Sequence, residues 1–286
     1  MPSLIDIRRR IRSVKNTQQI TRALKMVSSA KLRRAQSAVI AARPYDHLLR
    51  SVLANLAASA ASDDGLSEEP LLAVRPEKRI QVLLFTSDTG RCGAFNANLA
   101  KASVKFMADH RDAEIEFELI GRRGYDFHRK RGSRITGEHL NILSKPRHAD
   151  AAAIARKVME RFRNGEIDAV YVLNNDFKSV LSQTLNLARI LPVTLPEGTE
   201  SQDYIFEQSP VRMIGSLLPR YIEMAVYRAM LETVAGEHAA RMTAMDAATK
   251  NAGDVIDTLT LNMNRIRQAS ITKEIIEVVS GAAAAN

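Results

Sequence analysis

The last 67 residues of the chain, RYIEMAVYRAMLETVAGEHAARMTAMDAATKNAGDVIDTLTLNMNRIRQASITKEIIEVVSGAAAAN (Arg220–Asn286), decide the fold. They contain no proline, and their only glycines are Gly236, Gly253 and Gly281. Ala, Met, Leu, Ile, Glu and Arg, all good or acceptable helix formers, are frequent. One continuous helix here would be about 100 Å long at a rise of about 1.5 Å per residue. Helices in globular proteins usually have about 8–20 residues, so a helix this long needs a partner to pack against.

Part of this helix carries the pattern of a coiled-coil seam, in which apolar or small residues recur at alternating steps of three and four. Small residues in the middle of the seam allow close approach of a second backbone. The alternative is an amphipathic helix of an ordinary bundle, which the length of the stretch disfavours. The seam positions are Met242, Met245, Thr249, Ala252, Ile256, Leu259, Met263 and Ile266.

The N-terminal region predicts the partner helix, because residues 1–60 contain no glycine and only two prolines, Pro2 and Pro44. A seam starts at Ile7, Ile11 and Val14. We expect Pro44 to kink or interrupt this helix, and Pro219 to mark a break before the C-terminal one. Two long helices from opposite ends of one chain most simply form an antiparallel coiled coil. The helical spacing of the N-terminal seam includes Leu4 before Ile7 and continues after Val14 at Thr17, Ile20, Leu24 and Val27.

The middle of the chain has a different character and predicts a Rossmann-like α/β domain with a mostly parallel sheet. Residues 59–78 are small, acidic and contain Pro and Gly, as is typical of a linker. Apolar strands are then expected to alternate with helices. The predicted domains are an N-terminal coiled-coil helix (1–58), the linker (59–78), the α/β domain (79–205) and a C-terminal coiled-coil helix (209–286). The expected strands are 80–86, 115–120 and 169–173, with 191–195 as a further candidate. The expected helices are 96–109 and 149–163.

The charge is concentrated at one end of the chain. The formal net charge is +9, and the first 50 residues contain twelve Lys and Arg but only Asp6 and Asp46. This asymmetry indicates a negatively charged partner, such as nucleic acid, anionic lipid or an acidic protein. A single cysteine, Cys92, excludes an internal disulfide, and we find neither a secretory signal, a membrane-spanning run nor a metal site at ligand spacing.

Two stretches suggest chemistry of their own. The glycine-containing turn Ser87–Asn96 joins a strand to a helix, where phosphate-binding loops occur, but it lacks both common glycine patterns of such loops. We favour a tight connection in which Asp88 and Asn96 are capping residues. Cys92 as a nucleophile has no partner placed by the sequence. A nucleotide-dependent enzyme that uses this turn stays an alternative.

The other stretch is the basic N-terminal helix, which makes a coiled-coil nucleic-acid-binding protein the second alternative. Its cations, among them Arg8, Arg9, Arg10 and Lys15, are distributed around the helix rather than on one face. Aromatic residues make up 5% of the chain and tryptophan is absent, so a stacking platform for bases is not indicated. Nucleic acid is therefore not the favoured partner.

Three separated motifs resemble the gamma subunit of F-type ATP synthases. They are TQQITRALKMVSSAKLRRAQ (Thr17–Gln36), SDTGRCGAFN (Ser87–Asn96), and the pair EHAARMTAMDAATKN (Glu237–Asn251) and RQASITKEIIEVVSG (Arg267–Gly281). They occur in the family's order, and with the helix–α/β–helix layout the resemblance covers essentially the whole chain. The glycine turn departs from the family twice, since Arg91 stands where Leu is usual and Ala94 where Gly is common.

The resemblance implies a central rotor shaft that couples proton flow through a membrane ring to ATP synthesis or hydrolysis by rotation. The chain would be non-catalytic and would bind no cofactor, with Mg-ATP and Mg-ADP held at alpha–beta interfaces. Its partners would be three alpha and three beta subunits, the epsilon subunit and the c-ring, with one copy of this chain per complex and no nucleic acid. It would be a peripheral protein on the cytoplasmic side of the cell inner membrane.

The matching motifs also imply which residues contact partners. Positions expected to face the ring of alpha and beta subunits are Lys25, Met26, Lys31, Arg33, Arg34, Arg267 and Gln268. Candidates for contacts made by the α/β domain, the foot of the shaft, are Arg122, Arg123, Tyr204, Phe206 and Glu207. None of them is expected to be catalytic.

Overall fold

The computed structural model describes residues 3–60, 65–66, 69–179, 183–195 and 208–284. The chain divides into two compact units, which we call the coiled-coil unit (residues 1–28 and 241–286) and the body unit (residues 29–240). Two long helices, α1 (Leu4–Ser59) and α5 (Pro210–Ala284), contribute to both units. The prediction of long helices at both ends of the chain is thereby confirmed.

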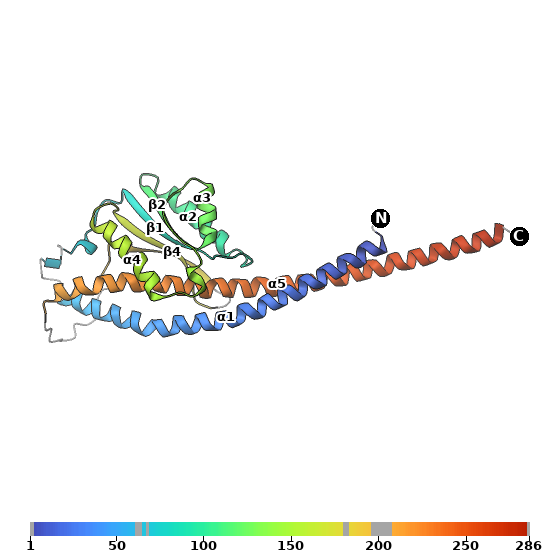
Figure 1. Ribbon diagram of the computed structural model, residues 1–286, viewed down its shortest axis with the longest axis horizontal. Helices are drawn as coiled ribbons and strands as arrows, with labels where there is room; N and C mark the ends of the chain where they lie inside the picture. The colour runs from blue at the N-terminus through green and yellow to red at the C-terminus, as the bar shows by residue number, and fades with distance from the viewer. Residues whose placement is uncertain (1–2, 61–64, 67–68, 180–182, 196–207, 285–286) are drawn as a thin grey trace. The chain divides into compact units, whose positions relative to one another are not determined.

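The body unit contains one five-stranded sheet in the order β3-β2-β1-β4-β5 (Figure 1). The first four strands in this order run parallel to their neighbours, whereas β5 runs antiparallel to β4. The expectation of a mostly parallel sheet is therefore confirmed. The strands are β1 (Arg79–Phe85), β2 (Glu114–Ile120), β3 (Arg134–His139), β4 (Ala169–Phe177) and β5 (Gln183–Leu191).

Helices cover both faces of the sheet, as an α/β domain requires. On one face, α2 (Phe95–Asp109) packs Phe95, Leu99 and Phe106 against alternate residues of β1. The helix α3 (Arg122–Lys130) follows β2 and contacts it. On the other face, α4 (His148–Arg163) and the first half of α5 bury their apolar sides together with Leu83 and Phe85. The sheet thus anchors α5 directly.

Within the body unit, α1 packs against α5 with the same alternation of three and four steps. Its least exposed positions include Leu32, Val39, Leu49, Leu53 and Leu56, and Leu49 and Leu53 form a cluster with Met224 of α5. The region after α1 is partly packed too. Leu71, in the 3-10 helix η2 (Pro70–Leu72), is fully buried in the core between the sheet, α4 and α5.

Three local expectations were wrong. Neither Pro44 nor Pro219 interrupts its helix, because buried residues on both sides of each proline, such as Val39 and Leu49 around Pro44, offset the lost hydrogen bond. Residues 191–195 do not form a strand; β5 instead covers Gln183–Leu191 and ends where Pro192 cannot donate to the ladder. The elements β3, α3 and the 3-10 helix η3 (Ile142–Ser144) were not predicted, because β3 (RITGEH) has no apolar alternation and α3 (RRGYDFHRK) is mostly polar.

Candidate partner-binding surfaces

In the coiled-coil unit, α1 and α5 run antiparallel and are joined by polar contacts across the seam. Lys25 Nζ lies 2.6 Å from Asp246 Oδ1, and Gln18 Nε2 donates to the carbonyl of Thr249 at 3.3 Å. Thr249 Oγ1 lies 2.8 Å from Thr21 Oγ1 and 2.7 Å from the Met245 carbonyl. As residue numbers rise along α1 from 18 to 25, the numbers of the residues they contact on α5 fall from 249 to 246. The two helices are therefore antiparallel, as expected from the sequence.

The eight positions proposed as the α5 seam lie on the least exposed stripe of that helix. Met245 is 7% exposed and Ala252 is 8% exposed, and the other six are half-buried. Glycine at position 253 lets the Gln18 side chain of α1 approach the α5 backbone closely, since a Cβ there would lie 3.3 Å from Gln18 Nε2. The remaining positions are Met242, Thr249, Ile256, Leu259, Met263 and Ile266.

On α1 the seam begins with apolar residues and then becomes polar. Ile7 is buried, and Ile11 and Val14 are half-buried. The stripe continues through Gln18, Thr21, Lys25 and Ser28, which keeps the strict alternation of three and four steps that a coiled coil requires.

The apolar residues of the sequence pattern therefore leave the seam after Val14. Ile20 and Val27 are 57% and 52% exposed, and Thr17 is exposed as well. The expected continuation was wrong at Thr17, Ile20 and Val27, because polar contacts with α5 replace apolar packing in this part of the helix, whereas Leu24 is half-buried. Ile20 and Val27 are instead available to a partner, a role the sequence reading missed.

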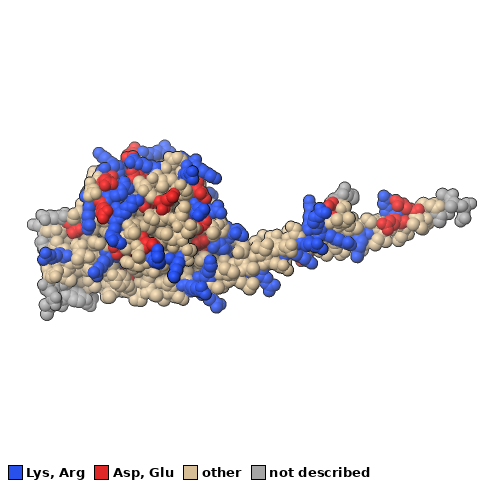
Figure 2. Space-filling model, viewed as in Figure 1, with Lys and Arg blue, Asp and Glu red and all other residues tan. Residues whose placement is uncertain are grey.

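The residues proposed to face a ring of partner subunits are mostly exposed. Met26 is 62% exposed. Lys25 is the exception, because its ammonium group pairs with Asp246, and that hydrogen bond lowers the pKa of the Asp246 carboxyl. Figure 2 shows Lys and Arg side chains gathered over the N-terminal turns of α1. The other exposed candidates are Lys31, Arg33, Arg34, Arg267 and Gln268.

The last turns of α5 carry a row of exposed apolar side chains. Every residue from Ile271 to Gly281 is exposed, so this part of the helix has no packed face in the described chain. The sequence motif Arg267–Gly281 includes these residues, but the seam pattern ends at Ile266 and did not predict an exposed surface beyond it. The exposed apolar residues are Ile271, Ile275, Ile276, Val278 and Val279.

Two of the five foot candidates can be placed. Arg122 and Arg123 are exposed at the start of α3, where Asp88 Oδ1 accepts the backbone N–H of Arg122 at 3.0 Å. Asp88 is thus a capping residue, but it caps α3 and not α2. Tyr204, Phe206 and Glu207 lie outside the described residues.

The turn Ser87–Asn96 is closed by its own side chains. Asn96 Oδ1 accepts from the backbone N–H of Ser87 at 3.0 Å, and Asn96 Nδ2 lies 3.1 Å from Cys92 Sγ. The helix α2 begins after Ala94 without a side-chain cap, so Asn96 does not cap it. Cys92 is 2% exposed, and Thr89 Oγ1 lies 3.4 Å from the Glu237 carboxylate. A buried thiol and a nearby carboxylate are both unfavourable for binding a phosphate or attacking a substrate.

Two buried carboxyl groups in the body unit have shifted pKa values. Burial by itself would raise the pKa of Glu118, but hydrogen bonds from His139 at 2.8 Å and Lys157 at 2.9 Å lower it overall. Burial and a hydrogen bond to Asp176 raise the pKa of Glu232 to about 8. Glu118 is enclosed by neighbouring strands and α4, and Glu232 lines a small cavity between α1 and α5 beside Arg43 and Arg228. We assign both groups a structural role, because each is paired with charged neighbours inside the body unit.

Within the part of the chain that the structure describes, no three His, Cys, Asp or Glu residues are grouped as a metal site would require. The same residues contain no helix that is long and apolar enough to cross a membrane. What the fold presents is a set of surfaces: charged and apolar positions on the coiled coil, and the outer helices of the α/β domain.

These features define a class of protein in which the two ends of the chain form a coiled coil and the sequence between them forms an α/β domain. Solved structures share this fold. A chain of the Euglena gracilis mitochondrial ATP synthase in rotational state 3 has a TM-score of 0.67 and 18% identity, covering 98% of this chain and 94% of that one. A rotor chain of the same enzyme in rotational state 1 has a TM-score of 0.65 and 20% identity, covering 94% and 98% respectively.

Sequence relatives identify the family. A sequence model of the ATP synthase family matches residues 3–285. The ATP synthase gamma chain of Solibacter usitatus is 63% identical over the full length of both chains, and that of Pelotomaculum thermopropionicum is 47% identical over 99% of each. The chain belongs to the ATP synthase gamma chain family. The predicted function as the gamma chain of an F-type ATP synthase is confirmed, and the nucleic-acid alternative has no support.

Proposed function

We propose that this chain is the non-catalytic rotor shaft of a proton-translocating ATP synthase. In this proposal one copy assembles with three alpha and three beta subunits, an epsilon subunit and the c-ring. The support comes from full-length identity to gamma chains and from the surfaces that the fold leaves open.

The observation that carries the proposal is the exposed apolar end of α5. The five exposed apolar side chains between Ile271 and Val279 have no packing partner in the described chain. Burial of apolar surface stabilises an interface by about 25 cal/mol per Å². An exposed apolar helix end of this kind suits insertion into an apolar collar, such as a ring of alpha and beta subunits would provide.

The coiled coil also fits a shaft whose rotation shifts the conformational equilibria of the subunits around it. A ligand shifts a conformational equilibrium only through its different affinities for the states. The charged and apolar residues around the coiled coil, such as Met26, Arg267 and the Lys25–Asp246 pair, make its sides unequal. Each rotational position would then favour a different state of each beta subunit.

We further propose that nucleotide binds to the alpha–beta interfaces and not to this chain. The strongest internal candidate for a nucleotide site, the turn Ser87–Asn96, is filled by the hydrogen bonds between Ser87, Asn96 and Cys92. In this proposal the chain acts as a peripheral protein on the cytoplasmic side of the inner membrane, attached through the c-ring and the epsilon subunit.

The test is co-expression with the alpha and beta subunits of the same organism, followed by size-exclusion chromatography and an ATPase assay. We expect a complex with three alpha, three beta and one copy of this chain, which hydrolyses ATP far faster than alpha and beta alone. Elution of the chain by itself, with no effect on hydrolysis by the other subunits, would refute the proposal. Labelled ATP should bind to the complex but show no saturable binding to this chain alone.

A further inference from the structure

An apolar groove of about 650 Å³ lies between α2 and α3 on the outer side of the α/β domain. Its floor is built from small apolar residues of α2, including Ala100 and Val104, and from Phe127 of α3. Positions 100, 104 and 108 of α2 are four residues apart and so lie in one row along the helix. All residues that line the groove belong to the body unit.

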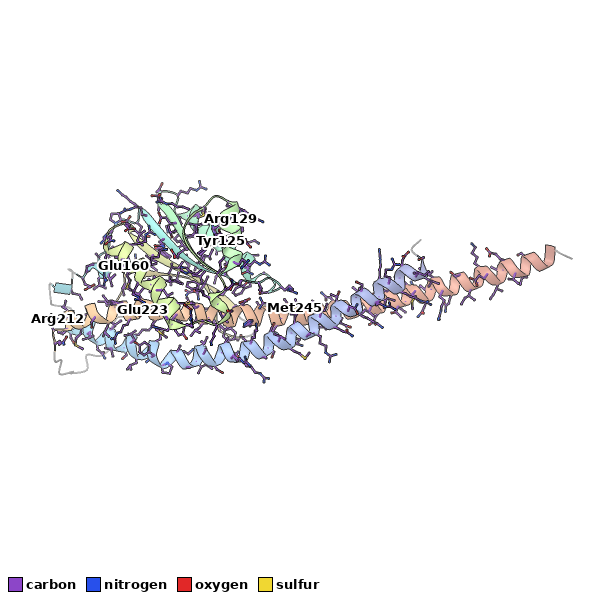
Figure 3. All side chains as sticks on the ribbon, in the orientation of Figure 1. Tyr125, Arg129, Glu160, Arg212, Glu223 and Met245 are labelled. Carbon is purple, nitrogen blue, oxygen red and sulfur yellow. The ribbon has the colours of Figure 1, made fainter. Side chains whose placement is uncertain are left out.

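Basic side chains form both sides of this groove. Lys101 and Lys105 stand one turn apart on α2, and Arg123 and Arg131 flank Phe127 on α3 and at its C-terminal end. The Arg131 guanidinium lies 4.4 Å from the centre of the Phe127 ring. Among the described residues, none of these four cations forms an ion pair with a carboxylate, unlike Arg161 on the opposite face, which pairs with Glu116 and Glu166. Figure 3 labels Tyr125 and Arg129, two residues of α3 that do not line the groove.

We propose that this groove binds an acidic amphipathic helix of a partner protein. The apolar floor would bury the apolar face of that helix, and carboxylates on both of its flanks would reach the lysines on one side and the arginines on the other. This is the helix-in-groove mode of recognition, with charge complementarity giving specificity.

The walls of the groove explain why the occupant is a helix. Both walls are helices whose backbone groups are already hydrogen-bonded, so they offer no sheet edge to which an extended strand could pair. A helix satisfies its own backbone and needs only side-chain contacts. The row from Ala97 to Ala108 is about 17 Å long at about 1.5 Å per residue, so the occupant needs about three turns. A nucleic acid would match the cations but has no apolar face for the floor.

The test uses the full-length chain and a fluorescent, hydrocarbon-stapled peptide helix of about four turns, because shorter unconstrained helices are marginal in water. The peptide has Leu along one face and Glu on both flanks. A second peptide has the same composition with its Leu residues dispersed. Anisotropy titrations compare the original chain, the Lys101→Glu/Lys105→Glu variant and a matched Lys145→Glu/Arg163→Glu variant, whose exposed cations lie outside the groove.

We expect saturable binding of the amphipathic peptide that weakens at least tenfold in the groove variant and less than twofold in the matched variant. Equal binding of the two peptides, or equal loss in the two variants, would mean unspecific attraction between charges and would overturn the proposal. Binding of phosphatidylglycerol vesicles by the groove, without binding of the peptide, would also overturn it in favour of a lipid. The proposal does not depend on the rotor function, because every arm is measured on the chain alone.

Discussion

His128 is held neutral in the folded body unit. Its ring is fully buried, Nε2 lies 3.0 Å from Ser103 Oγ, and Nδ1 lies 3.0 Å from Ser133 Oγ. Burial, assisted by the charge of Arg131, lowers the pKa of His128 from 6.5 to about 4. A histidine whose pKa is lower in the folded state stabilises the fold fully above pH 6.5, and this contribution is lost as the pH falls towards 4.

The first prediction concerns this residue. Across that range the free energy of unfolding should fall by on the order of 3 kcal/mol because of His128, at about 1.4 kcal/mol per pH unit. The His128→Gln variant should be less stable at pH 7.5 but should lack this part of the pH dependence. Urea unfolding between pH 7.5 and 4.5 measures both effects. The exposed His47→Gln variant should keep the original slope, and an unchanged slope in His128→Gln would rule out the assignment.

At the scale of the helices, Thr21 and Thr249 form a polar layer inside the coiled coil. Their hydroxyl oxygens are 2.8 Å apart, and Gln18 adds a bond to the Thr249 carbonyl. Polar layers in coiled coils fix the register at a cost in stability. This layer therefore defines how α1 and α5 align along their length.

A double-mutant cycle tests the layer. Thr21→Val and Thr249→Val should each cost about 1 kcal/mol, because each leaves the other hydroxyl group with one contact fewer. The Thr21→Val/Thr249→Val variant removes both hydroxyl groups with little change of shape, so its stability should lie within about 0.5 kcal/mol of the original chain. Thermal unfolding followed by circular dichroism gives both values. Additive losses in the double variant would show that the two hydroxyl groups do not interact.

The continuity of α5 matters as much as its seam. Ala252 is 8% exposed and lies inside the helix, where proline removes a backbone hydrogen bond and clashes with the preceding turn, costing about 3 kcal/mol. Under the proposed function, Ala252→Pro should uncouple ATP hydrolysis from proton pumping in the assembled complex. The exposed neighbour variant Asn251→Ala should pump normally. Full coupling in Ala252→Pro would contradict the need for a continuous helix.

Much of the secondary structure could be predicted from the sequence. Both long helices follow from residues 1–60 and 220–286, where glycine and proline are rare, and the α5 seam follows from its steps of three and four. The α1 seam was only partly predictable, since apolar Ile20 and Val27 indicate a seam that the strict heptad assigns to Thr21 and Ser28. Polar strands such as β3 are held by tertiary pairing with β2, which local sequence does not encode. The α2–α3 groove likewise appears only when two separate helices are brought together.

At the scale of the whole molecule, the chain combines surfaces that it packs itself with surfaces that it leaves for partners. The Rossmann-like domain and the seam bury their apolar residues within the chain. The five exposed apolar residues between Ile271 and Val279 do not, although their side chains are of the same types as many in the core. A monomeric protein gains nothing from exposing such residues, so their energetic contribution belongs to an assembly.

The last prediction distinguishes what the end of α5 contributes to the stability of the free chain from what it contributes to the stability of the complex. A chain that stops after Ser270 should unfold at the same temperature as the full chain, because residues 271–281 are all exposed. It should form a less stable complex with the alpha and beta subunits, since the apolar end of α5 is lost. The full-length Ile276→Glu/Val279→Glu variant should show the same pair of effects without any truncation. Calorimetry of the free chain and dilution-induced dissociation of the complex measure them. A lower unfolding temperature with unchanged assembly would place the role of this segment within the chain instead of at an interface.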